Sequence, residues 1–399
     1  MDALTTPSNW QRMRLGDVAE IKRGASPRPI ENPKWFCANS NVGWVRISDI
    51  SKNSRFLYKT AQKLSKKGIE KSRFIKQNSL IMSMCATIGK PIITKIDTCI
   101  HDGFVVFENP KIDLNYLYYF LCYIEKEWLE SGQQGSQVNL NVDLIKNKEV
   151  FYPKDLNEQI AIANVLSDVD HYLYSLRALI LKKESVKKAL SFELLSQRKR
   201  LRGFNQNWQR VRLGDICEFG NGGAYETLIV ENGDFKLISL NSIDIDGNLK
   251  NTMKRVNFYD NSLKQDDIVM VLSDVAHGDF LGLCAVIPSN DYVLNQRMGR
   301  LRKKNDCINI LFLRLYINAN QKYFKMQGQG SSQLNLSKKA IEDFEILLPP
   351  LNEQIAIANI LSDVDNEIIS LKNKKRQFDN IKKALNHDLM SAKIRVLKE

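Results

Sequence analysis

Two short segments carry amide and hydroxyl side chains between glycines. They are SGQQGSQVNLN at 131–141 and GQGSSQLNLS at 328–337, and they align through Gln137 with Gln333. Amides of glutamine and asparagine pair bidentately with the edge of adenine, and flanking glycines allow close approach of a backbone to a ligand. We therefore predict base contacts by Gln134, Ser136, Gln137, Gln329, Ser332 and Gln333. A capped turn that supports the surrounding domain is the structural alternative.

Cationic residues form the second chemical feature. The 399-residue chain has a formal net charge of +13 and a pI near 9.2, which indicates a polyanionic partner, although a solvated surface could have the same balance. Residues 52–76 hold nine Lys and Arg side chains against the single acid Glu70, a local net charge of +8. The predicted phosphate contacts there are Lys52, Arg55, Lys59, Lys63, Lys66, Lys67 and Arg73.

Further predicted DNA contacts lie on loops and at the ends of expected strands. The loop KRGASPRPIENPKWF contains Gly24 and three prolines, which exclude regular structure and expose its cations. The predicted contacts on this loop are Arg23, Arg28 and Lys34. Those on the following expected strand and in the second half of the chain are Arg46, Asn241, Lys254, Arg255, His277 and Arg297.

Catalytic motifs are not evident. The segment CATIGK lacks the first glycine and the final Ser or Thr of a phosphate-binding loop, and the four histidines have no HExxH spacing. There is no [DNS]-PP-[YF] run for amino-methyl transfer, since Leu348 precedes Pro349 and Pro350. His277 is the only candidate for chemistry, and we expect no catalysis by this chain.

Composition favours a folded cytoplasmic protein. The hydrophobic content is 43%, there is no run of 18 apolar residues, and the N-terminus lacks the features of a signal peptide. The seven cysteines are scattered and never spaced as CxxC, so we expect reduced, buried thiols with neither disulfides nor a zinc site.

An internal repeat organises the chain. LNEQIAIANVLSDVD at Leu156 returns as LNEQIAIANILSDVD at Leu351, and WQRMRLGDVAE at Trp10 returns as WQRVRLGDICE at Trp208. After each LNEQ, apolar residues recur at spacings of four and three, with lysines interrupting the heptad pattern near Lys183 and Lys375. No Pro or Gly falls between Leu156 and Arg202 or after Leu351, so each copy predicts one helix of about 42 residues, about 63 Å long.

Connectivity sets the direction of these helices. The first helix leaves the first non-helical region, here called the first lobe (residues 1–153), and the second region, the second lobe (203–349), follows shortly after its end. The second helix begins at Pro349 and Pro350, so pairing with the first requires an antiparallel coiled coil with pseudo-two-fold symmetry. A surface helix on a globular core is the alternative for each copy.

The sequence patterns of both lobes predict mixed α and β structure. Strands are expected at Gly43–Ile50 and Phe235–Ile243 and at Ser79–Met84 and Asp267–Leu272. One amphipathic helix is expected in Asn115–Glu130 and one in Ile308–Met326. Between these matched landmarks the lobes diverge, with His101, Asp102 and Gly103 opposite Asn295, Gln296 and Arg297. We predict a common frame that carries two different contact faces.

This layout resembles the specificity subunit of type I restriction-modification systems. The resemblance covers nearly all of the chain and rests on the two W-x-x-x-x-LGD openings, the G-x-S-P-R loop with GWVRISDI, the G-S-Q-x-N-L segments and the two P-x-x-LNEQ helices. One departure is GNGGAYETL at 220–228, where the second lobe lacks G-x-[ST]-P.

The resemblance implies an α+β fold with two target-recognition domains, 1–153 and 203–349, and two spacer helices, 154–202 and 350–399. Each domain would read one half of a bipartite asymmetric DNA sequence. Two methyltransferase subunits would dock on the helices and methylate adenine with S-adenosylmethionine, and endonuclease and translocase subunits would cut unmodified DNA. ATP and Mg²⁺ belong to those partners, and no cofactor or metal is expected in this chain.

Docking is predicted at the repeated LNEQ segments, where the side chains could instead stabilise the first helical turn. The residues concerned are Asn157, Glu158, Gln159, Asn352, Glu353 and Gln354. Two other functions stay open, a specificity subunit of a related system whose partner fuses methyltransferase and nuclease, and a coiled-coil scaffold that does not bind DNA.

Overall fold

The chain divides into two compact units, each of which contains one lobe and part of both long helices. The computed structural model describes residues 7–51, 55–131, 140–275 and 278–396. The first unit is Met1–Arg177 with Lys374–Glu399, and the second is Ala178–Asn373. Within the described residues, no helix is long and apolar enough to cross a membrane, and no cluster of His, Cys, Asp and Glu could hold a metal ion.

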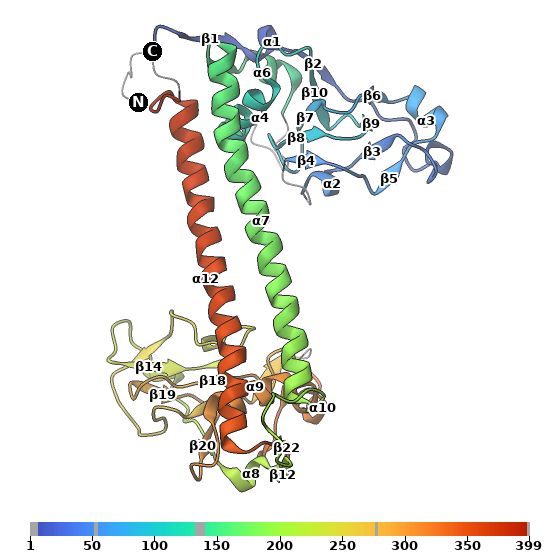
Figure 1. The fold of residues 1–399 in the computed structure, drawn as a ribbon. Helices are drawn as coiled ribbons and strands as arrows, with labels where there is room; N and C mark the ends of the chain where they lie inside the picture. The colour runs from blue at the N-terminus through green and yellow to red at the C-terminus, as the bar shows by residue number, and fades with distance from the viewer. Residues whose placement is uncertain (1–6, 52–54, 132–139, 276–277, 397–399) are drawn as a thin grey trace. The chain divides into compact units, whose positions relative to one another are not determined.

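Two β-sheets form most of the described first lobe, beside a separate two-stranded pairing of its first and last strands (Figure 1). Among the described residues the larger sheet has the strand order β2-β10-β7-β8-β4, and the smaller has the order β5-β3-β9-β6. The bounds of the larger sheet are Glu20–Arg23 (β2), Phe104–Glu108 (β10), Leu80–Ser83 (β7), Pro91–Thr94 (β8) and Phe56–Leu57 (β4). Those of the smaller are Gln62–Lys63 (β5), Gly43–Val45 (β3), Thr98–Ile100 (β9) and Arg73–Ile75 (β6).

The larger sheet is buried on both faces, which explains its continuous apolar strands. Val105 and Phe107 of β10 join a core with α4 (Leu114–Tyr123) and α7 (Leu156–Leu195). Phe104 and Val106, which point the opposite way, join a core with the smaller sheet. This packing positions the turn between β9 and β10 at the junction of the two sheets.

The opening of the lobe is tied to its end. Strand β1 (Trp10–Arg14) pairs antiparallel with β11 (Glu149–Pro153), and the LGD turn forms α1 (Leu15–Val18) against α6 (Val142–Asn147). A Cβ on Gly16 would lie 3.1 Å from the Cβ of Lys146, so this glycine permits close packing of α1 on α6. The repeated LGD is therefore structural.

The second lobe repeats this plan. Its larger described sheet has the order β13-β20-β16-β18, with bounds Cys217–Asn221, Met298–Lys303, Ile268–Val271 and Cys284–Val286. A second sheet has the order β15-β14-β19, with bounds Arg255–Val256, Phe235–Ile238 and Tyr292–Leu294. Alternate residues of β16 again enter two cores, one containing α9 (Ile310–Ala319) and α12 (Leu351–Met390) and the other backed by β19.

The second lobe is closed in the same way. Strand β12 (Gln209–Arg212) pairs with β22 (Glu345–Leu348), and α8 (Leu213–Ile216) contacts α11 (Lys338–Glu342). An additional ribbon joins β17 (Ser273–Val275) to β21 (Gln333–Asn335). This ribbon holds the segment GQGSSQLNLS (328–337) beside the end of β16.

The two long helices pair antiparallel within each unit. In the first unit Lys382 of α12 pairs with Asp170 of α7, and Tyr172 packs on Phe378 with ring centroids 4.5 Å apart. In the second unit Lys183 pairs with Glu367 at 2.7 Å, and Lys187 pairs with Asp365. Rising numbers on one helix thus meet falling numbers on the other. The predicted fold class, two mixed α and β lobes with an antiparallel pair of long helices, is confirmed.

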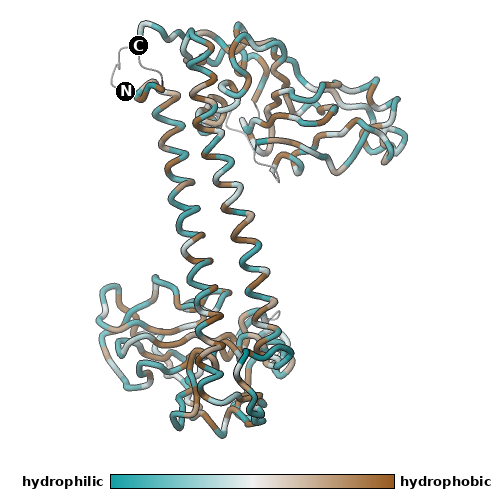
Figure 2. The backbone as a smooth tube through the Cα atoms, viewed as in Figure 1, coloured by the Kyte–Doolittle hydropathy of each residue, from teal (hydrophilic) through white to brown (hydrophobic). Residues whose placement is uncertain are grey.

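Apolar and charged side chains share the helix contact. Ile162, Leu166, Ile357 and Leu361 are fully buried, or nearly so, near the helix starts, and hydrophobic positions recur along both helices in Figure 2. Of the lysines that interrupt the heptad pattern, Lys183, Lys187 and Lys382 form the cross-helix ion pairs described above. Lys375 instead pairs with Asp379 of its own helix at 2.7 Å.

Several expected elements are shorter than the sequence patterns predicted. The strands expected at Gly43–Ile50 and Phe235–Ile243 end at Val45 and Ile238, because short helices follow, α2 (Ile47–Ser51) and the 3-10 helix Leu240–Ser242. Asp49 and Ser242 stabilise their first turns by accepting from the Arg46 and Ser239 amides. After the expected strand Asp267–Leu272, residues Ser273–Val275 form a further strand, β17.

The helices expected in Asn115–Glu130 and in Ile308–Met326 are each divided into two shorter helices. The breaks fall at Ile124 and Asn320, after which α5 (Glu125–Ser131) and α10 (Gln321–Gln327) begin. The Asn320 side chain donates to the Tyr316 carbonyl, competing with the backbone bonds that would continue the helix. The expectation of buried cysteines is also wrong at two positions, since Cys37 and Cys307 are exposed.

Leu361→Ala should lower the free energy of unfolding by about 2–5 kcal/mol, because Leu361 is fully buried in the core that α12 shares with α9. Ile369→Ala on the same helix is the matched control, since Ile369 is 48% exposed and its loss should cost less than about 1 kcal/mol. Urea unfolding followed by circular dichroism measures both. Equal effects would contradict the helix contact described here.

Candidate nucleic-acid interface

The loop after β2 is held against the turn that joins β9 to β10. Gly24 and Ala25 donate their backbone amides to Phe104 and Ile100 at 2.8 and 3.0 Å. A Cβ on Gly24 would lie only 2.1 Å from the His101 carbonyl oxygen, so no other residue fits there without displacement. The glycine thus brings the basic loop onto the turn.

The second lobe has the same arrangement despite its different sequence. Gly222 and Gly223 donate to Met298 and Leu294, and a Cβ on Gly222 would lie 2.1 Å from the Asn295 carbonyl oxygen. Gly222 therefore takes the place of Gly24. The absent G-x-[ST]-P motif does not remove this loop contact.

Asp102 gathers the basic loop of the first lobe. Its carboxylate accepts from the Ser26 hydroxyl at 2.7 Å and from Arg28 Nη2 at 2.9 Å, and its carbonyl oxygen accepts from Arg23 Nε at 2.7 Å. The hydrogen bond from Ser26, with the charge of Arg28 adding to it, lowers the pKa of Asp102. Arg23 and Arg28 are exposed yet already engaged within the chain.

A hollow, the first hollow, opens beside this turn. It has a volume of about 340 Å³ and is lined by Arg23, Met84, Cys85, His101, Asp102, Gly103 and Leu140. His101 Nδ1 accepts from the Gly103 amide at 2.9 Å, and burial lowers the His101 pKa. The neutral ring therefore carries its proton on Nε2, which can donate a hydrogen bond.

A second hollow lies at the corresponding turn of the second lobe, between β19 and β20. It measures about 430 Å³. Its lining comprises Leu240, Asn241, Ile243, Lys250, Val271, Ser273, Asp274, Phe280, Arg297, Ser332 and Gln333. Four predicted DNA contacts, at positions 241, 297, 332 and 333, are thus brought together from separate segments. Four residues that line the hollows were not among the predicted contacts: His101, Asp102, Lys250 and Asp274. The divergence between the matched turns 101–103 and 295–297 was the sequence signal that could have identified His101 and Asp102.

Most cations of the basic segment lie at the surface of the first lobe. Lys59 is exposed, as are Lys63 on β5 and Lys66 and Lys67 on α3 (Lys66–Glu70). Arg73 Nε donates to the Arg23 carbonyl, which ties this segment to the basic loop. These positions agree with a phosphate-facing role, which stays a prediction.

The prediction that Arg55 contacts phosphate is wrong. Arg55 is 7% exposed, and its guanidinium donates to the Tyr119 hydroxyl, to Ser167 Oγ and to Asn115 Oδ1. Three oxygens offset the burial of this cation at Nη1 and Nη2, while its buried Nε has no hydrogen-bond partner among the described residues. Arg55 therefore anchors α4 to α7 and does not face DNA.

The other predicted contacts lie at varied positions. Arg46 is exposed and donates to Gln62, Lys34 lies 4.3 Å from the centroid of the Trp35 ring, and Arg255 donates to the Gly233 carbonyl. Lys254 and Gln329 are exposed. Predicted contacts outside the described residues are Lys52, Gln134, Ser136, Gln137 and His277.

The glutamates of the repeated LNEQ segments are internal ties. Glu158 is 2% exposed and accepts from the Trp10 indole at 3.4 Å and from Asn9 at 3.0 Å. Glu353 is fully buried and accepts from the Trp208 indole at 3.0 Å and from Arg200 Nη2 at 2.7 Å. Each glutamate thus links a long helix to the opening tryptophan of its own lobe.

The neighbouring glutamines repeat this role. Gln159 donates to the Pro153 carbonyl and accepts from the Asp113 amide, both at 2.8 Å. Gln354 does the same with Pro349 and Asn309, again at 2.8 Å. Since these four side chains are buried, the prediction that they dock a partner is wrong, and only Asn157 and Asn352 are exposed.

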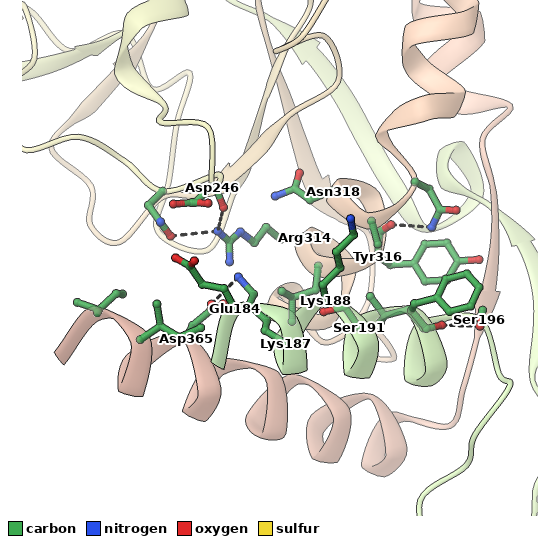
Figure 3. A pocket seen from close by; sticks show the side chains of 18 of the residues that line it. Glu184, Lys187, Lys188, Ser191, Ser196, Asp246, Arg314, Tyr316, Asn318 and Asp365 are labelled. Atoms are coloured by element: carbon green, nitrogen blue, oxygen red, sulfur yellow. Dashed lines mark hydrogen bonds and ion pairs between the residues drawn. The ribbon is translucent and has the colours of Figure 1, made fainter. Parts of the chain in front are cut away.

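A larger pocket of about 930 Å³ lies in the second unit among α7, α12 and α9 (Figure 3). Its charges are largely paired, with Lys187 on Asp365, Lys372 Nζ 2.8 Å from Glu184, and Arg314 donating to the Gly247 carbonyl. Burial lowers the pKa of Arg314. With little excess positive charge, this pocket does not resemble a phosphate-binding site.

Comparison with known proteins assigns the family. A family model described as "Type I restriction modification DNA specificity domain" matches residues 7–183 and 205–378. The chain belongs to this family. As a member with two copies of the specificity domain, it is a DNA sequence-recognition subunit with two target domains.

Named relatives and solved structures agree with the assignment. The type I restriction enzyme MjaVIII specificity subunit of Methanocaldococcus jannaschii is 26% identical over 99% of this chain and 95% of its own length. The EcoprrI specificity subunit of Escherichia coli is 25% identical over 35% of each chain. The structure of an S subunit from M. genitalium shares the fold, with a TM-score of 0.63, 17% identity and 97% coverage of both chains.

Glu353→Gln should lower the free energy of unfolding by about 3 kcal/mol, because it removes a fully buried charge that pairs with the partly exposed Arg200. Asn352→Ala, at an exposed neighbouring position, is the control and should stay within about 0.5 kcal/mol. Thermal and urea unfolding measure the loss. Unchanged stability with weakened binding of a methyltransferase would instead restore the docking prediction.

Arg55→Ala should destabilise the first unit by about 2 kcal/mol through its lost hydrogen bonds. Lys63→Ala should leave stability within about 0.5 kcal/mol and reduce the slope of log K against log salt concentration by about 1. Urea unfolding and a salt titration of DNA binding separate the two. A reduced salt slope for a stable Arg55→Ala protein would place Arg55 on the DNA surface after all.

Proposed function

We propose that this chain is the specificity subunit of a type I restriction-modification complex and that each lobe reads one half of a bipartite asymmetric DNA site. The main support is the pair of hollows at equivalent turns of two matched lobes, because their linings differ chemically. The described lining of one hollow carries an imidazole, the Asp102 carboxylate and one tethered arginine, Arg23. The lining of the other carries two amides, Lys250, Asp274 and the exposed Arg297. Unlike linings favour unlike half-sites.

Affinity and sequence preference come from different parts of each lobe. Exposed lysines such as Lys59 and Lys63 supply sequence-independent attraction to phosphates. Short polar side chains around the hollows supply hydrogen bonds to base edges. This division supports a binding protein rather than a coiled-coil scaffold, since a scaffold needs no such surface.

The chemistry belongs to partner subunits in this proposal. Two methyltransferase subunits with S-adenosylmethionine modify adenine, and restriction subunits with ATP and Mg²⁺ cut unmodified DNA. A solved structure similar in fold to this chain, with a TM-score of 0.60 and 15% identity over 96% of this chain and 98% of its own, comes from work titled as complex assembly of the type I R-M system. Exposed apolar residues on the long helices, including Tyr174 and Leu181, are available for docking.

Co-expression with the cognate methyltransferase should produce one bipartite methylated motif with a fixed gap, mapped by single-molecule sequencing of host DNA. Replacing residues 204–348 with the domain of another specificity subunit should change one half of the motif and leave the other. The same methyltransferase without this chain is the control. Absence of any motif from a soluble, assembled complex would contradict the proposal.

A further inference from the structure

Arg297 stands out among the arginines of the second lobe. Arg210, Arg212, Arg300 and Arg302 form ion pairs, and Arg255 and Arg314 donate to backbone carbonyls. Arg297 is exposed, and within the described residues its guanidinium has no hydrogen-bond or ion-pair partner. It alone keeps all five donors free for a ligand.

The backbone at Arg297 is strained and firmly held. Its φ is 68°, in the left-handed region that a long side chain adopts at a cost of roughly 1 kcal/mol or more. Its carbonyl accepts from the Leu272 amide at 3.0 Å, and the preceding Gln296 amide donates to Gly223 at 2.6 Å. Asn295, 2% exposed, anchors the turn through its contact with Tyr225. The turn therefore fixes the direction in which the Arg297 side chain leaves the backbone.

Its neighbours in the second hollow are suited to base edges. Asn241 comes from the 3-10 helix Leu240–Ser242 and Gln333 from β21, and neither side-chain amide has a partner among the described residues. Ser332 adds a hydroxyl. Arginine pairs bidentately with guanine O6 and N7, and amides pair with adenine.

In the described part of the first lobe, no arginine takes the place of Arg297. Gly103 occupies the position that Arg297 takes in the second lobe, and Arg23 and Arg28 are tied to Asp102. Among the described residues, a free guanidinium at this turn is therefore found only in the second lobe.

We infer that Arg297 reads a guanine in the half-site of the second lobe, with Asn241 and Gln333 contacting adjoining base pairs. The inference rests on the DNA-recognition function proposed above. It assigns a chemical role that a phosphate contact would not have, because a phosphate contact carries no base preference.

The test compares the wild-type complex with Arg297→Lys and Arg297→Asn. Lysine keeps the charge but loses the planar fork, and asparagine tolerates the left-handed backbone while removing the cation. Binding to duplexes in which each base pair of the second half-site is replaced in turn gives the base preference. We expect discrimination at one G·C pair to fall by about 5- to 150-fold in both variants, with the first half-site read as before.

Controls separate the possible failures. Lys339→Ala, at an exposed position on α11 outside the second hollow, should bind and discriminate like the wild type. Thermal unfolding should show that both Arg297 variants remain folded. The asparagine variant keeps the test valid if the lysine is strained.

Three results would overturn the inference. A wild-type half-site for the second lobe without a G·C pair leaves Arg297 nothing to read, and a uniform affinity loss across all sequences would make it a phosphate contact. In both cases a bipartite motif still exists, so the proposed function survives. If the wild-type complex recognises no motif, the proposed function fails and this inference fails with it.

Discussion

A buried carboxylate at the start of each long helix is the interaction on which the rest of each unit depends. Glu158 and Glu353 have almost no exposed surface, so each must find donors inside the protein. The donors are the indoles of Trp10 and Trp208, at the first strand of each lobe, and Arg200 adds a cation to Glu353. Helix start, lobe opening and lobe closure therefore meet at one point.

The adjacent glutamines extend this constraint to the helix that carries the lobe core. Gln159 and Gln354 bridge the last strand to the residues that begin α4 and α9, namely Asp113 and Asn309. The strands behind these helices are buried on both faces and deliver the turns at 101–103 and 295–297 to an edge of the lobe. Rigid support of a short variable turn is what a recognition site needs, because base discrimination depends on fixed hydrogen-bond geometry.

Variation between the lobes is concentrated where it does not disturb this frame. Gly24 and Gly222 make the same close backbone approach although their flanking sequences differ. Beside them, Asp102 restrains two arginines in one lobe, whereas Arg297 is unrestrained in the other. The contact between the long helices combines two kinds of interaction. Buried leucines stabilise it, and cross-helix ion pairs such as Lys183 with Glu367 accommodate the polar interruption of the heptad pattern.

The sequence by itself determined the repeat, the long antiparallel helices, the mixed α and β lobes and the family. The first three follow from periodicity and chain connectivity, which are local or one-dimensional properties, and the family follows from the resemblance of the repeated motifs. Tertiary structure decided which polar residues are available. Arg55 lies in a cationic run yet is buried under α4 and α7, and the LNEQ side chains look exposed by type yet close the lobes. Likewise, only folding brings Asn241, Arg297 and Gln333 to one hollow, since burial and convergence depend on contacts between residues distant in the chain.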